Sequence, residues 1–153
     1  GEGPFLNSVE SGTEQTRRVT ALGNPTVHSR KDLALHFALS TYLTATKGAA
    51  AADAAGLLKE TLDAQGGSGF SFADLAADRA GIRFSEGVLS NRFKLPILAK
   101  SFTVRDFVPN VGGLPEGLQA AEFTRDYGGK GDRRFNAQLS DIERRINELP
   151  PYR

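Results

Sequence analysis

Apolar residues near the C-terminal end of the chain recur at alternating intervals of four and three, the spacing that places them on one face of an α-helix. These residues are Phe135, Leu139, Ile142, Ile146 and Leu149. The segment SDIERR supplies polar residues for the other face, and two prolines at 150 and 151 end the pattern. A helix with one apolar face must bury it against other elements, so this segment predicts a packed helical domain.

Four further helices are predicted upstream, at about residues 29–47, 50–65, 71–81 and 115–127. The clearest start signal is FSFADL, in which Ser71 is the expected N-cap and Asp74 follows three residues later. The first helix is apolar nearly all round, as expected of a central, buried helix. The sequence therefore predicts an all-α fold, a single compact domain of about five helices around a buried first helix.

The remaining segments carry weaker signals. Residues 1–27 are predicted to form an irregular N-terminal segment, with TRRVTALGNPTV as a short strand or extended arm. Residues 28–153 are predicted to be a single helical domain. Within it, residues 82–113 should be loop-rich, with one or two short helical turns and a small extended piece at SFTV. The first helix should begin with Ser29 as its N-cap, and Pro115 should occupy the first turn of a later helix.

Composition excludes several classes of protein. A formal net charge of +1 argues against a chain built to bind nucleic acid specifically. Without cysteine there can be no disulfide framework, thiolate metal site or cysteine nucleophile. The chain lacks a run of 18 apolar residues and is not expected to be transmembrane. Methionine is absent, at position 1 as well, which predicts that a signal segment or another leading segment has been removed.

Charge is distributed unevenly along the chain. Residues 49–78 hold five acidic residues against one lysine, a net charge of −4, and residues 79–105 hold six basic residues against one glutamate, a net charge of +5. The favoured interpretation is that the two segments pack side by side and neutralise each other. The alternative is a module that binds anionic surfaces through residues 79–105, with salt-sensitive binding that reversal of Arg92 and Lys94 would abolish.

His36 is the sharpest candidate for a functional residue, because it lies midway along the helix expected to be most buried. A buried imidazole must find hydrogen-bond partners, and helical spacing places Ser40 and Asp32 within reach. One interpretation is a core histidine satisfied by a neighbouring carbonyl or carboxylate. The other is a functional histidine. His28 is assigned no role.

Acidic residues of the next two helices are the other candidates. Glu60 lies nearly opposite Leu58 and Leu62, which are expected to face inward with Ala55, so Glu60 is predicted to be solvated. Lys59 and Asp63 form an i,i+4 pair near the edge of that face.

The third helix adds two more carboxylates. Asp74 is accounted for as part of a cap, where negative charge is favoured, whereas Asp78 has no local explanation. A histidine and several carboxylates could bind a hard divalent cation or form a general acid–base pair. The spacing matches no standard metal motif, and GGSG is interpreted as a linker.

Three motifs in residues 32–81 form a pattern: DLALHFALS, KETLD and GFSFADLAADRAG. This pattern resembles that of the YfiM-like family of small bacterial envelope proteins, and the matching positions are Asp32, His36, Phe37, Lys59, Glu60, Asp63, Asp74 and Gly81. Asp78 stands where the family pattern has asparagine, and Leu33 where it usually has lysine. The resemblance implies a bacterial periplasmic or envelope setting and implies no reaction. It also returns Glu60 to the candidate residues.

Two functional hypotheses follow. The favoured one is a non-enzymatic helical envelope domain that binds an unknown protein or small-molecule partner, with a buried His/carboxylate network. The alternative is a metal-dependent or acid–base hydrolase, with His36, Asp63 and Asp78 as catalytic residues and a divalent cation as candidate cofactor. Lys59, Glu60 and Ser40 are the candidate ligand-binding residues.

Overall fold

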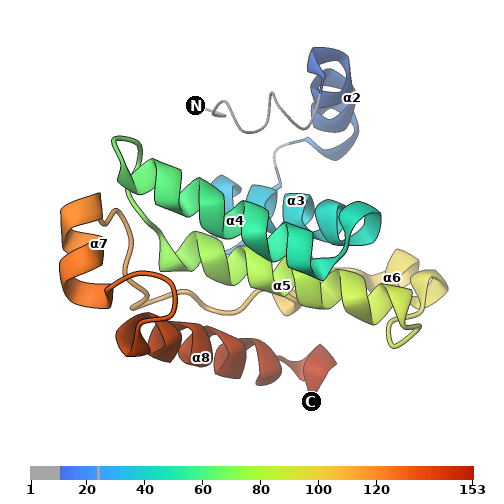
Figure 1. Ribbon diagram of the computed structural model, residues 1–153. Coiled ribbons are helices and arrows are strands. Elements are labelled where there is room, and N and C mark those ends of the chain that lie inside the picture. Colours follow the sequence, from blue (N-terminus) through green and yellow to red (C-terminus); the bar gives the residue numbers. More distant parts are fainter. Residues whose placement is uncertain (1–10, 24) are drawn as a thin grey trace.

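A computed structural model describes residues 11–23 and 25–153, which form an all-α fold (Figure 1). The α-helices are α2 (Gly12–Leu22), α3 (Lys31–Lys47), α4 (Ala49–Ala64), α5 (Phe72–Leu89), α6 (Leu95–Ser101), α7 (Ala120–Tyr127) and α8 (Arg133–Asn147). Two 3-10 helices, η1 (Val104–Asp106) and η2 (Pro150–Tyr152), complete the order. Extended structure in the described residues is limited to two isolated bridges, 27–30 and 70–118. The predicted all-α class is confirmed.

Helix α5 is the central element, with α4 along one side and α8 along the other (Figure 1). Burial continues along most of its length, from Phe72 at its start to Gly87 near its end. The first predicted helix, α3, instead buries one side, and its Tyr42 is 57% exposed. The reason is composition: α5 is rich in alanine and glycine, so neighbouring helices can approach it from several directions.

Helices α3 and α5 approach most closely at Gly81. A Cβ atom added there would overlap the backbone carbonyl of Phe37 on α3. The Thr41 hydroxyl lies at the same crossing and donates to the carbonyl oxygens of Phe37 (2.8 Å) and Gly81 (3.2 Å). This contact fixes the register of α3 along α5, and it thereby fixes where the polar residues of the two helices meet.

Helix α4 packs through its smallest residues. Ala52, Gly56, Glu60 and Ala64, spaced four apart, are buried. The prediction that Leu58 and Leu62 face inward is wrong, because they are 58% and 57% exposed. A face of alanine and glycine allows the α4 backbone to lie close to α5, which a leucine face would prevent.

The segment after Gly81 is more helical than predicted. Helix α5 continues to Leu89 because Gly81 serves as a packing site inside the helix and not as its end. Residues 82–113 then contain α6 and η1, in agreement with the predicted short helical turns. The extended piece predicted at SFTV is absent from this described segment, since these residues span the end of α6 and the start of η1.

Three further local predictions, one about an extended segment and two about helix starts, are corrected. Residues 1–27 were expected to be irregular, with TRRVTALGNPTV as a short strand or extended arm, but residues 12–22 form α2; residues 1–10 and 24 lie outside the described residues. Ser29 is not an N-cap, because it adopts φ +64° in a turn and α3 begins after Arg30. Pro115 precedes α7, whose N-cap is Gln119, while Gly128 ends that helix in the left-handed conformation as predicted.

Helix α8 confirms the pattern read at the C-terminal end of the sequence: Phe135, Ile142 and Ile146 are buried. Phe135 joins an aromatic cluster in which Phe70 stacks on Phe123 with ring centroids 4.1 Å apart. Within residues 11–23 and 25–153, no helix combines the length and the apolar character needed to cross a bilayer.

Candidate functional site

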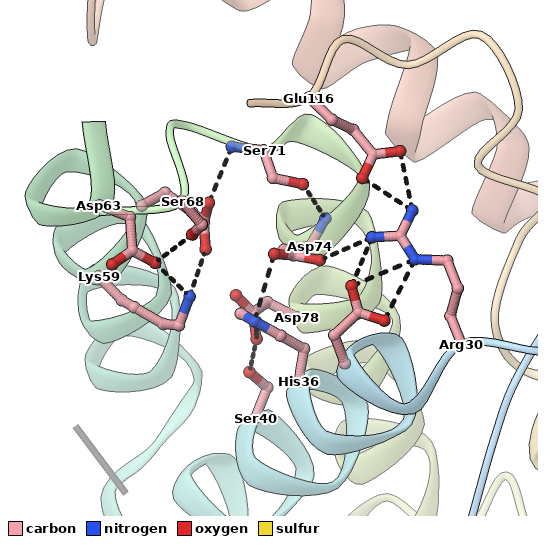
Figure 2. A network of polar contacts seen from close by, with 12 residues as sticks. Arg30, His36, Ser40, Lys59, Asp63, Ser68, Ser71, Asp74, Asp78 and Glu116 are labelled. Atoms are coloured by element: carbon pink, nitrogen blue, oxygen red, sulfur yellow. Dashed lines mark hydrogen bonds and ion pairs between the residues drawn. The ribbon is translucent and has the colours of Figure 1, made fainter. Parts of the chain in front are cut away.

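A continuous polar network lies between α3, α4 and α5, with His36 at its centre (Figure 2). His36 is 8% exposed. Its Nδ1 atom lies 3.1 Å from Asp78 Oδ1, and its Nε2 atom lies 3.5 Å from Asp74 Oδ2. The Ser40 hydroxyl donates to the same Asp78 oxygen at 2.7 Å. Both ring nitrogens of His36 thus face carboxylates of α5.

Glu60 enters the network from α4 and is fully buried, which corrects the prediction that it is solvated. One of its oxygens accepts the Ser71 backbone N–H at 2.8 Å, and the other accepts from the Lys59 ammonium at 3.0 Å. The prediction failed because it took Leu58 and Leu62 as the inward residues. With those leucines exposed, Glu60 falls on the inner face of α4.

Asp74 has two roles, of which the sequence indicated one. Its backbone N–H donates to the Ser71 hydroxyl at 3.0 Å, as the predicted cap requires. Its carboxylate also lies between His36 and Arg30, whose Nη2 is 3.4 Å from Asp74 Oδ1. A sequence signal existed, because Asp74 and Asp78 are one helical turn apart and therefore share a face of α5.

Two ion-pair groups close the ends of the network (Figure 2). At one end, Lys59 lies 2.8 Å from Asp63, which also accepts from the Ser68 hydroxyl. His36 and Asp63 both lie in the described part of the chain, and no hydrogen bond or ion pair joins them. At the other end, Arg30 bridges Asp32 and Glu116, and Asp32 therefore does not serve as the partner of His36.

The network shifts the pKa of several members. Burial disfavours the imidazolium of His36, but the charge and hydrogen bond of Asp78 and the charge of Asp74 outweigh it and raise the pKa to about 9. Burial raises the pKa of Glu60 to about 7, although Lys59 acts in the opposite direction. Burial also raises the pKa of Asp74. Burial therefore disfavours the charged carboxylates of Glu60 and Asp74, and a proton or a cation bound to them is favoured.

One oxygen of the network lacks a partner among the described residues. Asp78 Oδ2 is buried without a hydrogen bond and points toward Gly56 on α4, where an added Cβ atom would lie 2.6 Å from it. Gly56 therefore makes the space that the Asp78 carboxylate occupies.

Three side chains of the network are close enough together to hold a metal ion. His36, Glu60 and Asp74 each offer one ligand atom, and these atoms all lie within 4.8 Å of one another. They come from three different helices and are at least mostly buried. Of the candidate residues chosen from the sequence, the structure brings His36, Ser40, Asp78 and Glu60 into one network. Lys59 and Asp63 form an ion pair at one end of it, and within the described residues no hydrogen bond or ion pair joins Asp63 to His36.

The Ser71 cap offers a test of the local structure. Replacing Ser71 with alanine removes the oxygen that accepts from the Asp74 N–H but keeps the Ser71 N–H that Glu60 needs. We expect a loss of about 1 kcal/mol in the free energy of unfolding, measured with urea. Ser90→Ala, at the exposed C-terminal end of the same helix, should change it little. Equal free energies of unfolding for Ser71→Ala and wild type would show that the cap does not stabilise the protein.

Fold and site together define an all-α domain with a buried histidine–carboxylate centre. Comparison with known proteins finds no match: no protein-family model, no curated protein and no solved structure is similar to this chain. The function must therefore be argued from the site.

Proposed function

We propose that this chain is a ligand-binding helical domain and that its ligand is a divalent cation held by His36, Glu60 and Asp74. The observation that carries the proposal is the convergence of their three ligand atoms within 4.8 Å. Imidazole and carboxylate ligands suit zinc, manganese and related divalent ions. Because each ligand comes from a different helix, a bound ion would join α3, α4 and α5.

The surroundings of His36 support this proposal. Histidines that bind a metal through one ring nitrogen usually donate the other N–H to a carboxylate, which fixes the orientation of the ring. Asp78 is placed for this role at 3.1 Å from Nδ1, and Ser40 in turn donates to Asp78. Nε2 then remains for the cation.

The local charge count also favours a divalent cation. With His36 neutral, as a cation ligand must be, the network in the described part of the chain holds two cations, Lys59 and Arg30, against six carboxylates, a net charge of −4. The carboxylates are those of Asp32, Glu60, Asp63, Asp74, Asp78 and Glu116. Uncompensated charge is costly at such a buried position. A divalent cation would offset part of this charge without displacing Lys59, and it would replace the proton that His36 holds in the metal-free protein.

The hydrolase alternative has less support. It requires His36, Asp63 and Asp78 to act together, but Asp63 pairs with Lys59 and Ser68. It also requires a substrate to reach His36, which is 8% exposed. A binding role needs only that a small ion reach the site. The resemblance of residues 32–81 to YfiM-like proteins supports a bacterial periplasmic or envelope setting as part of the same proposal.

The test is the thermal stability of chelator-treated protein with added zinc, manganese, magnesium or calcium. At a hundredfold excess over its dissociation constant, a bound ion stabilises by about 2.7 kcal/mol, which raises Tm by roughly 5–10 °C in a domain of this size. His36→Ala and Glu60→Gln should lose this rise.

Asp63→Asn is the matched control, since it removes a neighbouring carboxylate outside the three ligands and should keep the rise. Titration calorimetry of the same variants gives the stoichiometry, which should be one ion per chain. The proposal is wrong if none of the four ions raises Tm, or if the rise is the same in wild type and His36→Ala.

A further inference from the structure

The end of the molecule formed by α6 exposes large apolar side chains. Leu89, Leu95 and Ile97 are 61–63% exposed, and Phe102 is 45% exposed. No residue of α6, which lies wholly within the described chain, is buried. We call these four residues the α6 surface. It projects at the C-terminal end of α5, away from α7 (Figure 1). Exposed apolar side chains concentrated along one short segment make that segment a candidate interaction site.

Basic residues surround the α6 surface. Arg92, Lys94, Lys100 and Arg105 are all exposed, and the sequence from 87 to 105 contains no Asp or Glu. With the exposed acids Glu86 and Asp106 at its two ends included, the net charge of residues 86–106 is +2. The positive charge of residues 79–105 was expected to be neutralised by residues 49–78. Within the described part of the chain, the ion pair that joins these two segments is Arg79–Asp53. The bases nearest α6 are left facing solvent.

The α6 surface is held in place from beneath. The Phe93 ring fills the space above Gly87, and its backbone N–H donates to the Gly87 carbonyl at 2.9 Å. Leu98 packs on the hydrophobic core, and Phe102 contacts the rings of Phe84 and Phe107. The segment that carries the exposed side chains is thus anchored to α5 and to the aromatic core, so binding requires little ordering of it.

A hollow adjoins the α6 surface. It has a volume of about 470 Å³. Its lining residues are Val88, Asn91, Phe93, Lys94, Leu95 and Pro96. The lining combines four apolar residues with the Asn91 amide and the Lys94 ammonium group.

We propose that the α6 surface binds the surface of an anionic phospholipid bilayer. Leu95 and Ile97 would enter the boundary between headgroups and acyl chains, while Lys94 and Lys100 remain at the level of the phosphates. Each lysine near an anionic surface contributes about 1 kcal/mol, and the buried apolar area adds to this. The binding is peripheral, and it does not depend on the proposed cation site.

The positive charge and the exposed apolar side chains together favour an anionic bilayer over other partners. A second copy of the chain would bring the same positive rim against this one, which like-charge repulsion disfavours. A nucleic acid would satisfy the bases but leave Leu95 and Ile97 without apolar contacts. An anionic bilayer satisfies both groups at once.

The test measures co-sedimentation of the full chain with two kinds of vesicle: phosphatidylcholine alone, and equal parts of phosphatidylglycerol and phosphatidylcholine. We expect binding to the anionic vesicles only, weakened by added salt. Lys94→Gln/Lys100→Gln should weaken it roughly 30-fold, from the loss of two such contributions. Arg92 is left intact because it holds the Tyr152 carbonyl at 2.8 Å.

The apolar contribution has its own matched pair of variants. Leu95→Ser/Ile97→Ser should weaken binding about tenfold or more. Leu58→Ser/Leu62→Ser removes two side chains of similar exposure from α4, where Asp63 adjoins them, and should change binding little. Circular dichroism and the melting temperature of each variant establish that it is folded.

Three outcomes would overturn the proposal. They are no binding to anionic vesicles, equal binding to both kinds of vesicle, and an equal loss of binding in Leu95→Ser/Ile97→Ser and Leu58→Ser/Leu62→Ser. Salt-sensitive binding that the lysine variant loses but Leu95→Ser/Ile97→Ser keeps would also overturn it, because a purely electrostatic surface does not need the apolar side chains. If the leucine–isoleucine variant fails to fold, the lysine variant and the vesicle comparison still decide.

Discussion

Replacing Gly81 with alanine should lower the free energy of unfolding by about 3 kcal/mol, the upper range for overpacking a helix contact. Alanine by itself would favour the helix by about 1 kcal/mol, so the sign is decided by packing. The added Cβ would overlap the Phe37 carbonyl, a backbone atom that can move only if α3 and α5 separate. Urea unfolding followed by circular dichroism measures the change.

Gly12→Ala is the control for this substitution. An added Cβ at Gly12, in α2, meets nothing within 4 Å, so its effect should be neutral or slightly stabilising. Because Gly81 also sets the register of α3 on α5, Gly81→Ala should reduce the cation-induced rise in Tm as well. Wild-type stability in Gly81→Ala would mean that the two helices are farther apart than the structure shows.

The metal-free protein should lose stability as the pH rises from 6.5 through 9. In the unfolded chain the pKa of His36 is near 6.5, and in the folded chain it is about 9, so the folded state holds the proton more tightly. Its contribution is fully present below pH 6.5 and is lost as the pH passes 9. Its size is about 3 kcal/mol, at 1.36 kcal/mol per pKa unit.

Glu60 acts in the same direction at lower pH. Burial raises its pKa from 4.5 to about 7, so its protonated form is favoured by folding and the corresponding stability is lost between those values. Surface carboxylates act the other way only in more acidic solution, because arginine hydrogen bonds lower the pKa of Asp32 and Asp141 below 3.8. The window from 6.5 to 9 therefore reports mainly on His36.

Urea titrations in the presence of a chelator, at several pH values across this window, measure the effect. His36→Gln should remove the slope between pH 6.5 and 9, although it lowers overall stability by disrupting the contacts to Asp74 and Asp78. His28→Gln is the control, since His28 contacts the Val108 carbonyl outside the network and its loss should keep the slope. A flat wild-type profile would show that folding does not raise the pKa of His36.

Much of the local structure could be predicted from the sequence. The spacing of Phe135, Ile142 and Ile146 identified α8, and FSFADL identified the start of α5 with Ser71 as its cap. Both signals are local: a periodic face and a cap depend on residues within one or two turns. For the same reason the need of His36 for a polar partner could be predicted, since it depends only on burial.

The identity of that partner could not be predicted in the same way. Asp32 was within reach of His36 by spacing but pairs with Arg30, while Asp74 and Asp78, on another helix, face the imidazole. Asp74 was fully explained by its cap, which concealed its second role. A local explanation for a residue does not exclude a distant contact.

What the sequence determined by itself was the all-α class, the positions of most helices and the candidate status of His36, because propensity, capping and periodicity act over a few residues. What only the tertiary structure decided was which face of each helix is buried. On α4 the exposed leucines and the buried Glu60 reverse the hydrophobic pattern. The reason is that glycine and alanine allow a close approach to α5, and that Lys59, Ser71 and the His36 cluster compensate the buried carboxylate. These partners become neighbours only when the chain folds.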